Sequence, residues 1–185
     1  MKYRLILTIF TILATFLISG MTPVAAADYD HKLTSKKITF EWKINGANID
    51  IRLSAPTKGW VGVGFNPSKQ MKDANFIIGY VKNGKVKVTD DYGKSNKTHG
   101  KDSKAGGKKD VTGISGSEEN GTTTIAFTIP LNSGDSKDKS LDINGDTTVL
   151  LAYGSGRDSF KSRHKVHEIL NVNLASGAFK NNHKH

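Results

Sequence analysis

The sequence predicts an all-β fold, an antiparallel sandwich or barrel of about eight short strands. Apolar and polar residues alternate over short runs, which is the pattern of strands with one buried face. Asn-Gly pairs, which favour tight hairpin turns, recur between these runs. Beyond residue 27 no stretch has the apolar period of an amphipathic helix, and only residues 67–74 and 156–162 are expected to form single helical turns.

The first two predicted strands form a hairpin. Every second residue from Ile38 to Ile44 is apolar, and Asn45-Gly46 turns the chain into a second alternating run at residues 49–53. Six further strands are predicted at residues 61–65, 76–81, 86–88, 125–129, 149–153 and 169–174. Asn-Gly pairs precede three of these six, and such regular spacing is typical of a sandwich or barrel.

Residues 93–110 break this pattern. The segment holds six lysines and no large apolar side chain, so we expect a solvent-exposed loop. Nucleic-acid binding is disfavoured, because no aromatic residues lie between the lysines to stack on bases. A docking patch for an acidic protein partner is the remaining functional interpretation.

The first 27 residues have the composition of a secretory signal peptide. Lys2 and Arg4 precede an apolar run from Leu5 to Ile18, and a small-residue cleavage site follows at residues 25–27. The alternative is an uncleaved membrane anchor, for which the apolar run is short. Cleavage removes two positive charges and reduces the net charge from +10 to +8. We therefore expect a basic, soluble, secreted or periplasmic protein.

Three segments follow from this composition. Residues 1–27 are the signal peptide, residues 28–178 form one β-sandwich domain, and residues 179–185 are a disordered tail rich in Asn, Lys and His.

The chain contains no cysteine, which excludes several kinds of site. Disulfides, Cys-ligated zinc, iron–sulfur clusters, blue copper and covalently attached c-type haem all need a thiol. No paired carboxylates or nucleophile–base set stands out either. Asp90 and Asp91 are adjacent, so in a strand they point to opposite faces and cannot act as a pair. The sequence therefore predicts a protein that is not an enzyme.

A glycine-rich strand is the first candidate site. Gly62 and Gly64 alternate with apolar residues, and glycine within a strand allows a flat group to approach the backbone closely. No lysine-serine pair or helix start follows, so the run is not a phosphate-binding loop. The alternative is that the glycines lie beneath a large neighbour such as Trp60.

Met71 and six histidines are the candidate metal ligands. Met71 is the sole methionine after the signal peptide and lies in a polar stretch, where a core-filling role is less expected. Each histidine can simply be solvent-exposed. His164 and His167 together could bind zinc or copper, but no third ligand with suitable spacing accompanies them. The other histidines are His31, His99, His183 and His185.

Taken together, an ordered set of motifs resembles the DOMON domain, in its haem-binding cytochrome branch. The resemblance runs from about Ile38 to Leu174. Its motifs are residues 59–65, Met71, Ile78-Gly79, residues 88–92, residues 122–127, Pro130-Leu131 with Asp135 and Asp138, and residues 151–154. Asn75 departs from the pattern, because the family often has aspartate at that position, and the lysine-rich segment is unusually basic.

The resemblance implies an immunoglobulin-like β-sandwich that holds haem b non-covalently at one end. It implies Met71 and His164 as the axial iron ligands, with His167 as the alternative histidine, and Trp60 and Phe65 as lining residues. Met/His ligation raises the reduction potential and fills both axial sites, so it favours electron transfer over oxygen chemistry. An acidic protein is the expected redox partner.

Two other functions stay open from the sequence. A sugar-binding DOMON module without haem would stack its ligand on Trp42 or Trp60. A structural or adhesion sandwich would bind no ligand at all.

Overall fold

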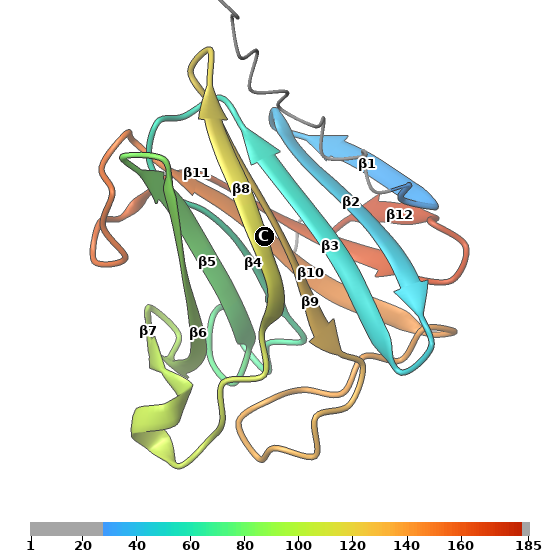
Figure 1. Cartoon of the computed structure of the whole chain (residues 1–185). Helices are drawn as coiled ribbons and strands as arrows, with labels where there is room; N and C mark the ends of the chain where they lie inside the picture. The colour runs from blue at the N-terminus through green and yellow to red at the C-terminus, as the bar shows by residue number, and fades with distance from the viewer. Residues whose placement is uncertain (1–27, 183–185) are drawn as a thin grey trace, which may run out of the picture.

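The structure, a computed structural model, describes residues 28–182 (Figure 1). The predicted signal peptide and the histidines at 183 and 185 lie outside the described residues. Within residues 28–182, no helix has the length and apolar character needed to cross a bilayer.

Two antiparallel sheets pack face to face (Figure 1). The five-stranded sheet, sheet A, has the order β1-β2-β3-β9-β8. Its strands are β1 (His31–Ser35), β2 (Ile38–Asn45), β3 (Asn48–Ala55), β8 (Thr112–Glu119) and β9 (Thr122–Pro130). The seven-stranded sheet, sheet B, has the order β12-β11-β10-β4-β5-β6-β7. Its strands are β4 (Val61–Phe65), β5 (Asn75–Lys82), β6 (Lys85–Ser95), β7 (Thr98–Lys101), β10 (Asp146–Gly154), β11 (His164–Asn173) and β12 (Phe179–Asn181). The short 3-10 helix η1 spans Asp102–Ala105.

The main core lies between the sheets, where apolar side chains at alternate positions meet. Phe40, Trp42 and Ile51 of sheet A are fully buried against Val63 and Leu151 of sheet B. The indole N–H of Trp42 donates a 2.8 Å hydrogen bond to the carbonyl of Leu174, which ties the two sheets together. The predicted immunoglobulin-like sandwich is confirmed.

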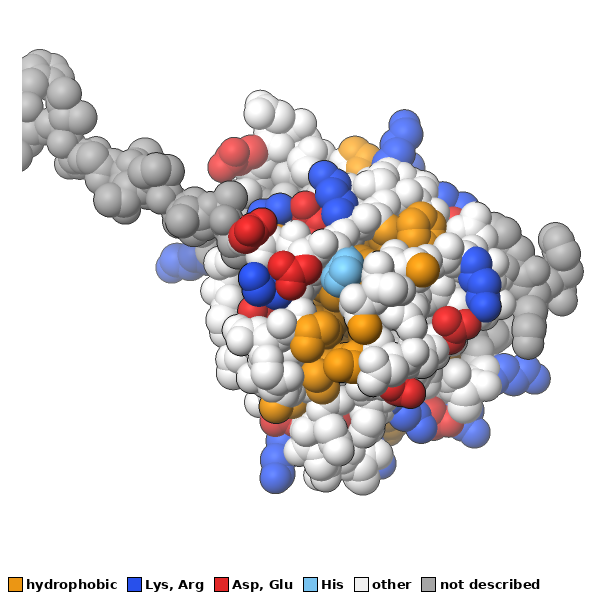
Figure 2. Space-filling model, turned by 90° about the vertical axis from the view of Figure 1, so that its right-hand side faces the viewer, with side chains coloured by type: hydrophobic (Ala, Val, Ile, Leu, Met, Phe, Trp, Pro, Cys, Tyr) orange, Lys and Arg blue, Asp and Glu red, His pale blue; other side chains and the backbone are white. Residues whose placement is uncertain are grey.

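The sheets do not close into a barrel. β1 ends sheet A and β12 ends sheet B, and no hydrogen-bonded register joins these two strands. Figure 2 looks onto this side of the molecule, where apolar side chains show among charged ones. Phe179 of β12 is 47% exposed, and the His31 ring lies 5.2 Å from Trp42.

All eight predicted strands are present, and four further strands were not predicted. β1, β7, β8 and β12 are short or polar strands at sheet edges, so they carry little apolar alternation. Three predictions need correction. Residues 67–74 and 156–162 form turns and bends and no helical turn. The lysine-rich segment is not a loop throughout, because it contains β7 and η1. The predicted disordered tail begins too early, because residues 179–181 form β12 and pair with β11.

β4 is the centre of sheet B and fixes which side chains lie outside the sandwich. Val61, Val63 and Phe65 point into the main core, so Gly62 and Gly64 lie on the outer face. In the row across the sheet, Gly62 pairs with Ala152 of β10 and with Ile78 of β5.

Candidate functional site

A second apolar cluster covers the outer face of sheet B. We call it the outer cluster; its buried members are Trp60, Ala74, Phe76, Ile78 and Tyr80, with Met71, Leu150, Ala152 and Phe160 packed against them. Most surface sheets present polar residues to water on the face turned away from the core. The apolar outer face of sheet B therefore marks this region as a candidate binding site.

The glycines of β4 lie beneath large side chains of the outer cluster. A Cβ atom on Gly64 would collide with the Phe76 ring, and one on Gly62 would come within 3.1 Å of the Ile78 side chain. The glycines thus do have a large neighbour, but it is Phe76, whereas Trp60 lies over Gly154. At these positions β4 carries no side chain of its own, and Phe76 and Ile78 cover its backbone.

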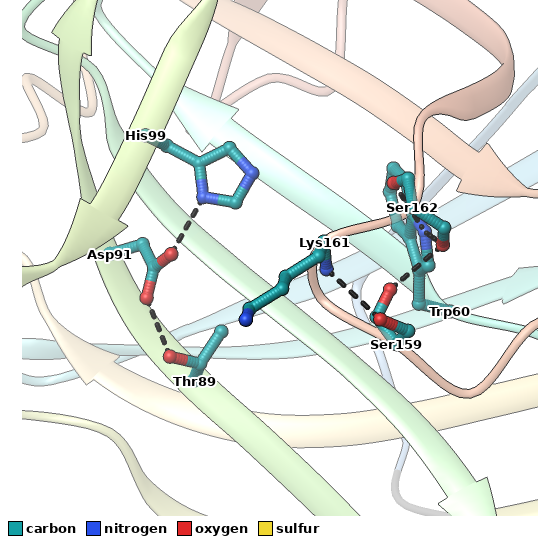
Figure 3. A network of polar contacts seen from close by, with 7 residues as sticks. All are labelled: Trp60, Thr89, Asp91, His99, Ser159, Lys161 and Ser162. Atoms are coloured by element: carbon teal, nitrogen blue, oxygen red, sulfur yellow. Dashed lines mark hydrogen bonds and ion pairs between the residues drawn. The ribbon is translucent and has the colours of Figure 1, made fainter.

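The connection between β10 and β11, residues 155–163, folds over the outer cluster. The Trp60 indole N–H donates to the Ser162 hydroxyl at 2.9 Å and to the Ser162 carbonyl at 3.2 Å. The Phe160 ring lies 4.8 Å from the Tyr80 ring. Figure 3 shows the contact of Trp60 with Ser162, with the Lys161 side chain extending from the connection toward β6. The 155–163 connection therefore covers the outer cluster and is held there by contacts with both Trp60 and Tyr80.

Met71 reaches the outer cluster from the connection between β4 and β5. That connection turns sharply, with positive φ values at Gln70 (54°) and Asp73 (62°) and a hydrogen bond of 2.9 Å from the Lys72 amide to the Lys69 carbonyl. The Met71 side chain packs against the outer cluster and is partly buried. A thioether sulfur is a ligand for soft or borderline metal centres, haem iron among them.

His164 and His167 reach the same face from β11. His167 pairs with Ala152, and His164 pairs with Gly154 across a register shift. Their rings lie 4.6 Å apart. Burial, followed by the nearby His167 and Arg163, lowers the pKa of His164 below its ordinary value. A lowered pKa favours the neutral imidazole of His164, which is the form that binds metals.

The structure places the predicted site residues in two different environments. Met71 and Trp60 belong to the outer cluster, and His164 and His167 lie on its β11 side. Phe65 is the exception: it is fully buried in the main core between the sheets, so it does not line this face. The reason is the strand period of two, which sends Phe65 to the face opposite the glycines.

A further histidine, His99, lies beside the outer cluster, where the sequence did not place it. His99 of β7 lies with its ring 5.7 Å from Phe76, and its Nδ1 is 2.6 Å from the Asp91 carboxylate. The Thr89 hydroxyl donates to the other Asp91 oxygen at 2.5 Å (Figure 3). The lysine-rich segment around His99 has no apolar pattern, so the sequence predicted that His99 lies in a solvent-exposed loop.

Asp91 is held in its charged form by these neighbours. Burial raises the pKa of Asp91, but the hydrogen bonds from His99 and Thr89 outweigh burial, and the pKa lies below its ordinary value. A carboxylate that fixes the orientation of an imidazole is a common arrangement beside metal sites.

Comparison with known proteins agrees with this architecture. The family model of the DOMON domain matches residues 34–154. The chain belongs to the DOMON family. The cytochrome b domain of pyranose dehydrogenase from Coprinopsis cinerea has the same fold, with a TM-score of 0.61 at 13% identity, covering 79% of this chain and 82% of that one. The cytochrome domain of Myriococcum thermophilum cellobiose dehydrogenase gives a TM-score of 0.55 at 10% identity, covering 76% and 79%.

Curated relatives are longer proteins. The DOMON chain described here is 29% identical over 160 residues to DBH-like monooxygenase protein 1 of Homo sapiens, and 29% identical to the protein of the same name in Mus musculus. These matches cover 82% and 81% of this chain but 25% of each relative. The chain therefore spans about a quarter of the length of these relatives.

The chemistry of the outer face fits a haem group. A thioether and two imidazoles border an apolar, aromatic surface, and the glycine backbone of β4 lies at its middle. The Phe76 ring lies over Gly64, so a flat ligand can reach that backbone only if the Phe76 ring moves.

Proposed function

We propose that this DOMON domain is an exported b-type cytochrome domain that binds haem b non-covalently and carries electrons. The observation that supports the proposal is the outer cluster, an apolar face that includes Met71 and Ala152, the strand partner of His167 on β11. Haem b would supply one-electron exchange between ferric and ferrous iron. The domain itself is not an enzyme in this proposal, because two protein ligands leave the iron no open position.

Each residue has a defined role in the proposal. Met71 supplies the thioether ligand and His164 the imidazole, with His167 as the alternative. His164 is preferred because burial and the nearby His167 and Arg163 lower the pKa of its imidazole, which favours the neutral, metal-binding form. Trp60 holds the 155–163 cover through Ser162, which keeps water away from the apolar face.

The test is a visible spectrum of the purified protein after titration with haemin, in the oxidised and reduced states. We expect one haem per chain, a sharp Soret band, and resolved α and β bands on reduction, as six-coordinate low-spin iron gives. A protein that takes up no haemin would overturn the proposal.

A carbohydrate-binding module is the second candidate, and the position of the tryptophans argues against it. Trp42 is fully buried in the main core, and Trp60 is 7% exposed beneath the 155–163 connection. Neither indole face is free to stack on a sugar ring in this conformation.

We also propose that an acidic protein is the redox partner. A groove of about 640 Å³ beside Met71 is lined by four lysines, Lys69, Lys72, Lys94 and Lys97, together with Ser68, Ser95 and Asn96. Two of these lysines come from the lysine-rich segment and two from the connection that carries Met71. Basic charge next to the site increases the encounter rate with an acidic carrier.

A further inference from the structure

A cluster of carboxylates lies beside β6, away from the outer cluster. Asp90 comes from β6, Asp102 opens η1, and Asp138 lies in the connection between β9 and β10. One carboxylate oxygen from each lies within 4.8 Å of the other two. Asp110 is close as well, because its backbone N–H donates to Asp90 at 3.0 Å. Three separate parts of the chain thus converge on one point.

Within residues 28–182, four buried carboxylate oxygens at this point have no hydrogen-bond partner. Asp102 is 1% exposed, and neither of its carboxylate oxygens has a hydrogen-bond partner. One buried oxygen of Asp90 and one of Asp110 are also without a partner. Among residues 28–182, no ion pair joins these carboxylates to a lysine or arginine. Buried charge without compensation is strongly unfavourable, so these oxygens need a positive ligand or protons.

Glycine at position 107 lets the Asp102 carboxylate lie against the backbone of the turn that follows η1. A Cβ atom on Gly107 would collide with the Asp102 carboxylate. The Gly107 amide donates a 3.2 Å hydrogen bond to the Asp102 carbonyl, which closes the turn after η1. Asp102 is therefore held in the interior by the shape of its own turn, although no polar group there satisfies it.

We propose that Asp90, Asp102 and Asp138 bind a calcium ion. Calcium is bound at 2.3–2.6 Å by oxygen ligands, so two ligands of one ion are separated by at most about 5 Å, which these three residues satisfy. The group contains no histidine or cysteine, which disfavours zinc and copper. Magnesium usually keeps several waters and binds one or two carboxylates, whereas this site offers three carboxylates, of which Asp90 and Asp102 are buried and Asp138 is partly buried.

Electrostatics supports the proposal. Burial, reinforced by neighbouring aspartates, raises the pKa of Asp90 to about 7 and that of Asp102 to about 6. Burial raises the pKa of Asp138 to about 6 as well. Mutual repulsion of this kind is what a bound divalent cation removes.

The proposed ion has a structural consequence for the lysine-rich segment. It would join β6, η1 and the β9–β10 connection, and so fasten residues 93–110 to the sandwich. Asp91, the neighbour of Asp90, instead contacts His99 near the outer cluster. The calcium site and the proposed haem site therefore use different side chains, and each can fail without the other.

The experiment uses the purified protein without added haem, freed of metal with EDTA. Isothermal titration with CaCl₂ should give one site per chain. Saturating CaCl₂ should raise the melting temperature by about 3–10 °C if affinity is in the range of extracellular calcium modules, whereas the same concentration of MgCl₂ should raise it much less.

Matched variants identify the ligands. Asp102→Asn and Asp138→Asn should each abolish calcium binding and the calcium-dependent rise in melting temperature. In EDTA both should melt at or above the wild-type temperature, because each removes one repelling charge. Asp142→Asn changes an exposed aspartate of the same β9–β10 connection and should bind calcium as the wild type does.

Three outcomes would overturn the proposal. Absence of binding heat together with equal melting temperatures in CaCl₂ and EDTA would mean that the carboxylates are simply protonated. Wild-type calcium binding by both Asp102→Asn and Asp138→Asn would place the ion elsewhere. Equal stabilisation by MgCl₂ would overturn the assignment to calcium.

Discussion

Gly93 of β6 lies directly against the peptide carbonyl of Met71. The Asp73 amide donates to the Gly93 carbonyl at 2.9 Å, and the Gly93 amide donates to the Ala74 carbonyl at 2.8 Å. A Cβ atom on Gly93 would collide with the Met71 carbonyl oxygen. The position of the proposed iron ligand is thus set by a strand that follows it by more than twenty residues.

The first prediction follows from this contact. Gly93→Ala should displace the Met71 backbone and convert part of the haem from low-spin to high-spin, as measured by the visible spectrum. Gly100→Ala is the matched control, because its Cβ would meet only the flexible side chain of Lys94. An unaltered spectrum in Gly93→Ala would show that Met71 does not bind the iron in this position.

Replacing the thioether itself gives the second prediction. Met71→Ala should open one coordination site and lower the reduction potential, because a thioether ligand favours ferrous iron. Spectroelectrochemical titration measures both effects. If the potential is unchanged, Met71 is not a ligand, and His99, with its Asp91 partner, becomes the next residue to test.

The third prediction separates the two histidines of β11. His164→Ala should lose the low-spin spectrum or the haem, while His167→Ala should keep both, since we assign the ligand to His164. Haem titration of the two variants side by side gives the answer. The reverse result would leave the fold and the cofactor in place and move the ligand by three residues.

The fourth prediction concerns the lysine groove. Reduction by an acidic partner should slow steeply with rising salt, because attraction across the encounter distance is screened over about 8–10 Å at physiological ionic strength. Changing Lys69, Lys72, Lys94 and Lys97 to Gln should flatten this dependence in stopped-flow measurements. The control replaces Lys85 and Lys87, exposed residues at the other end of β6. A rate that is insensitive to salt and to all substitutions would contradict a docking role.

The fifth prediction concerns stability. Arg52 donates a 2.6 Å hydrogen bond to Glu41, and this contact, aided by the charge of Arg52, lowers the pKa of Glu41 below its ordinary value. A lowered carboxyl pKa stabilises the fold above the ordinary value of 4.5, and this stabilisation disappears as pH falls through the lowered pKa. Glu41→Gln should therefore cost about 1 kcal/mol at pH 7 and almost nothing near pH 2. Thermal melts across this range measure the difference, and an equal loss at both pH values would contradict it.

The sequence predicted the fold where strands have one buried face. β2 and β3 alternate apolar and polar residues along their whole length, β9 alternates buried and partly buried residues, and the predicted ranges fall within these strands. β6 was predicted too short because Thr89, Asp90 and Asp91 are polar yet buried, which hides the continuation of the strand. β8 has a polar sequence at the edge of sheet A, where backbone pairing with β9 alone defines it.

The candidate site was predicted less completely. Met71 and Trp60 were found through the motif order, and the structure groups them. Phe65 was assigned to the site from the family resemblance, although the strand period points it into the core. His99 and the carboxylate cluster escaped because their members come together only through tertiary folding; Asp90 and Asp138 are distant in sequence and carry no common pattern.

The pairing of β4 with β10 has a consequence for the order of assembly. It joins Phe65 to Val149, so the centre of sheet B can close only after a long intervening stretch of chain has been organised. The connection that carries Met71 leads from β4 to β5 on one side of this pairing. β11, which carries the two histidines, lies next to β10 on the other side. We therefore expect the outer cluster to form in the last stage of folding, after the β2–β3 and β5–β6 hairpins. A cofactor bound there would be captured by the finished sandwich and could not serve as the nucleus around which the chain folds.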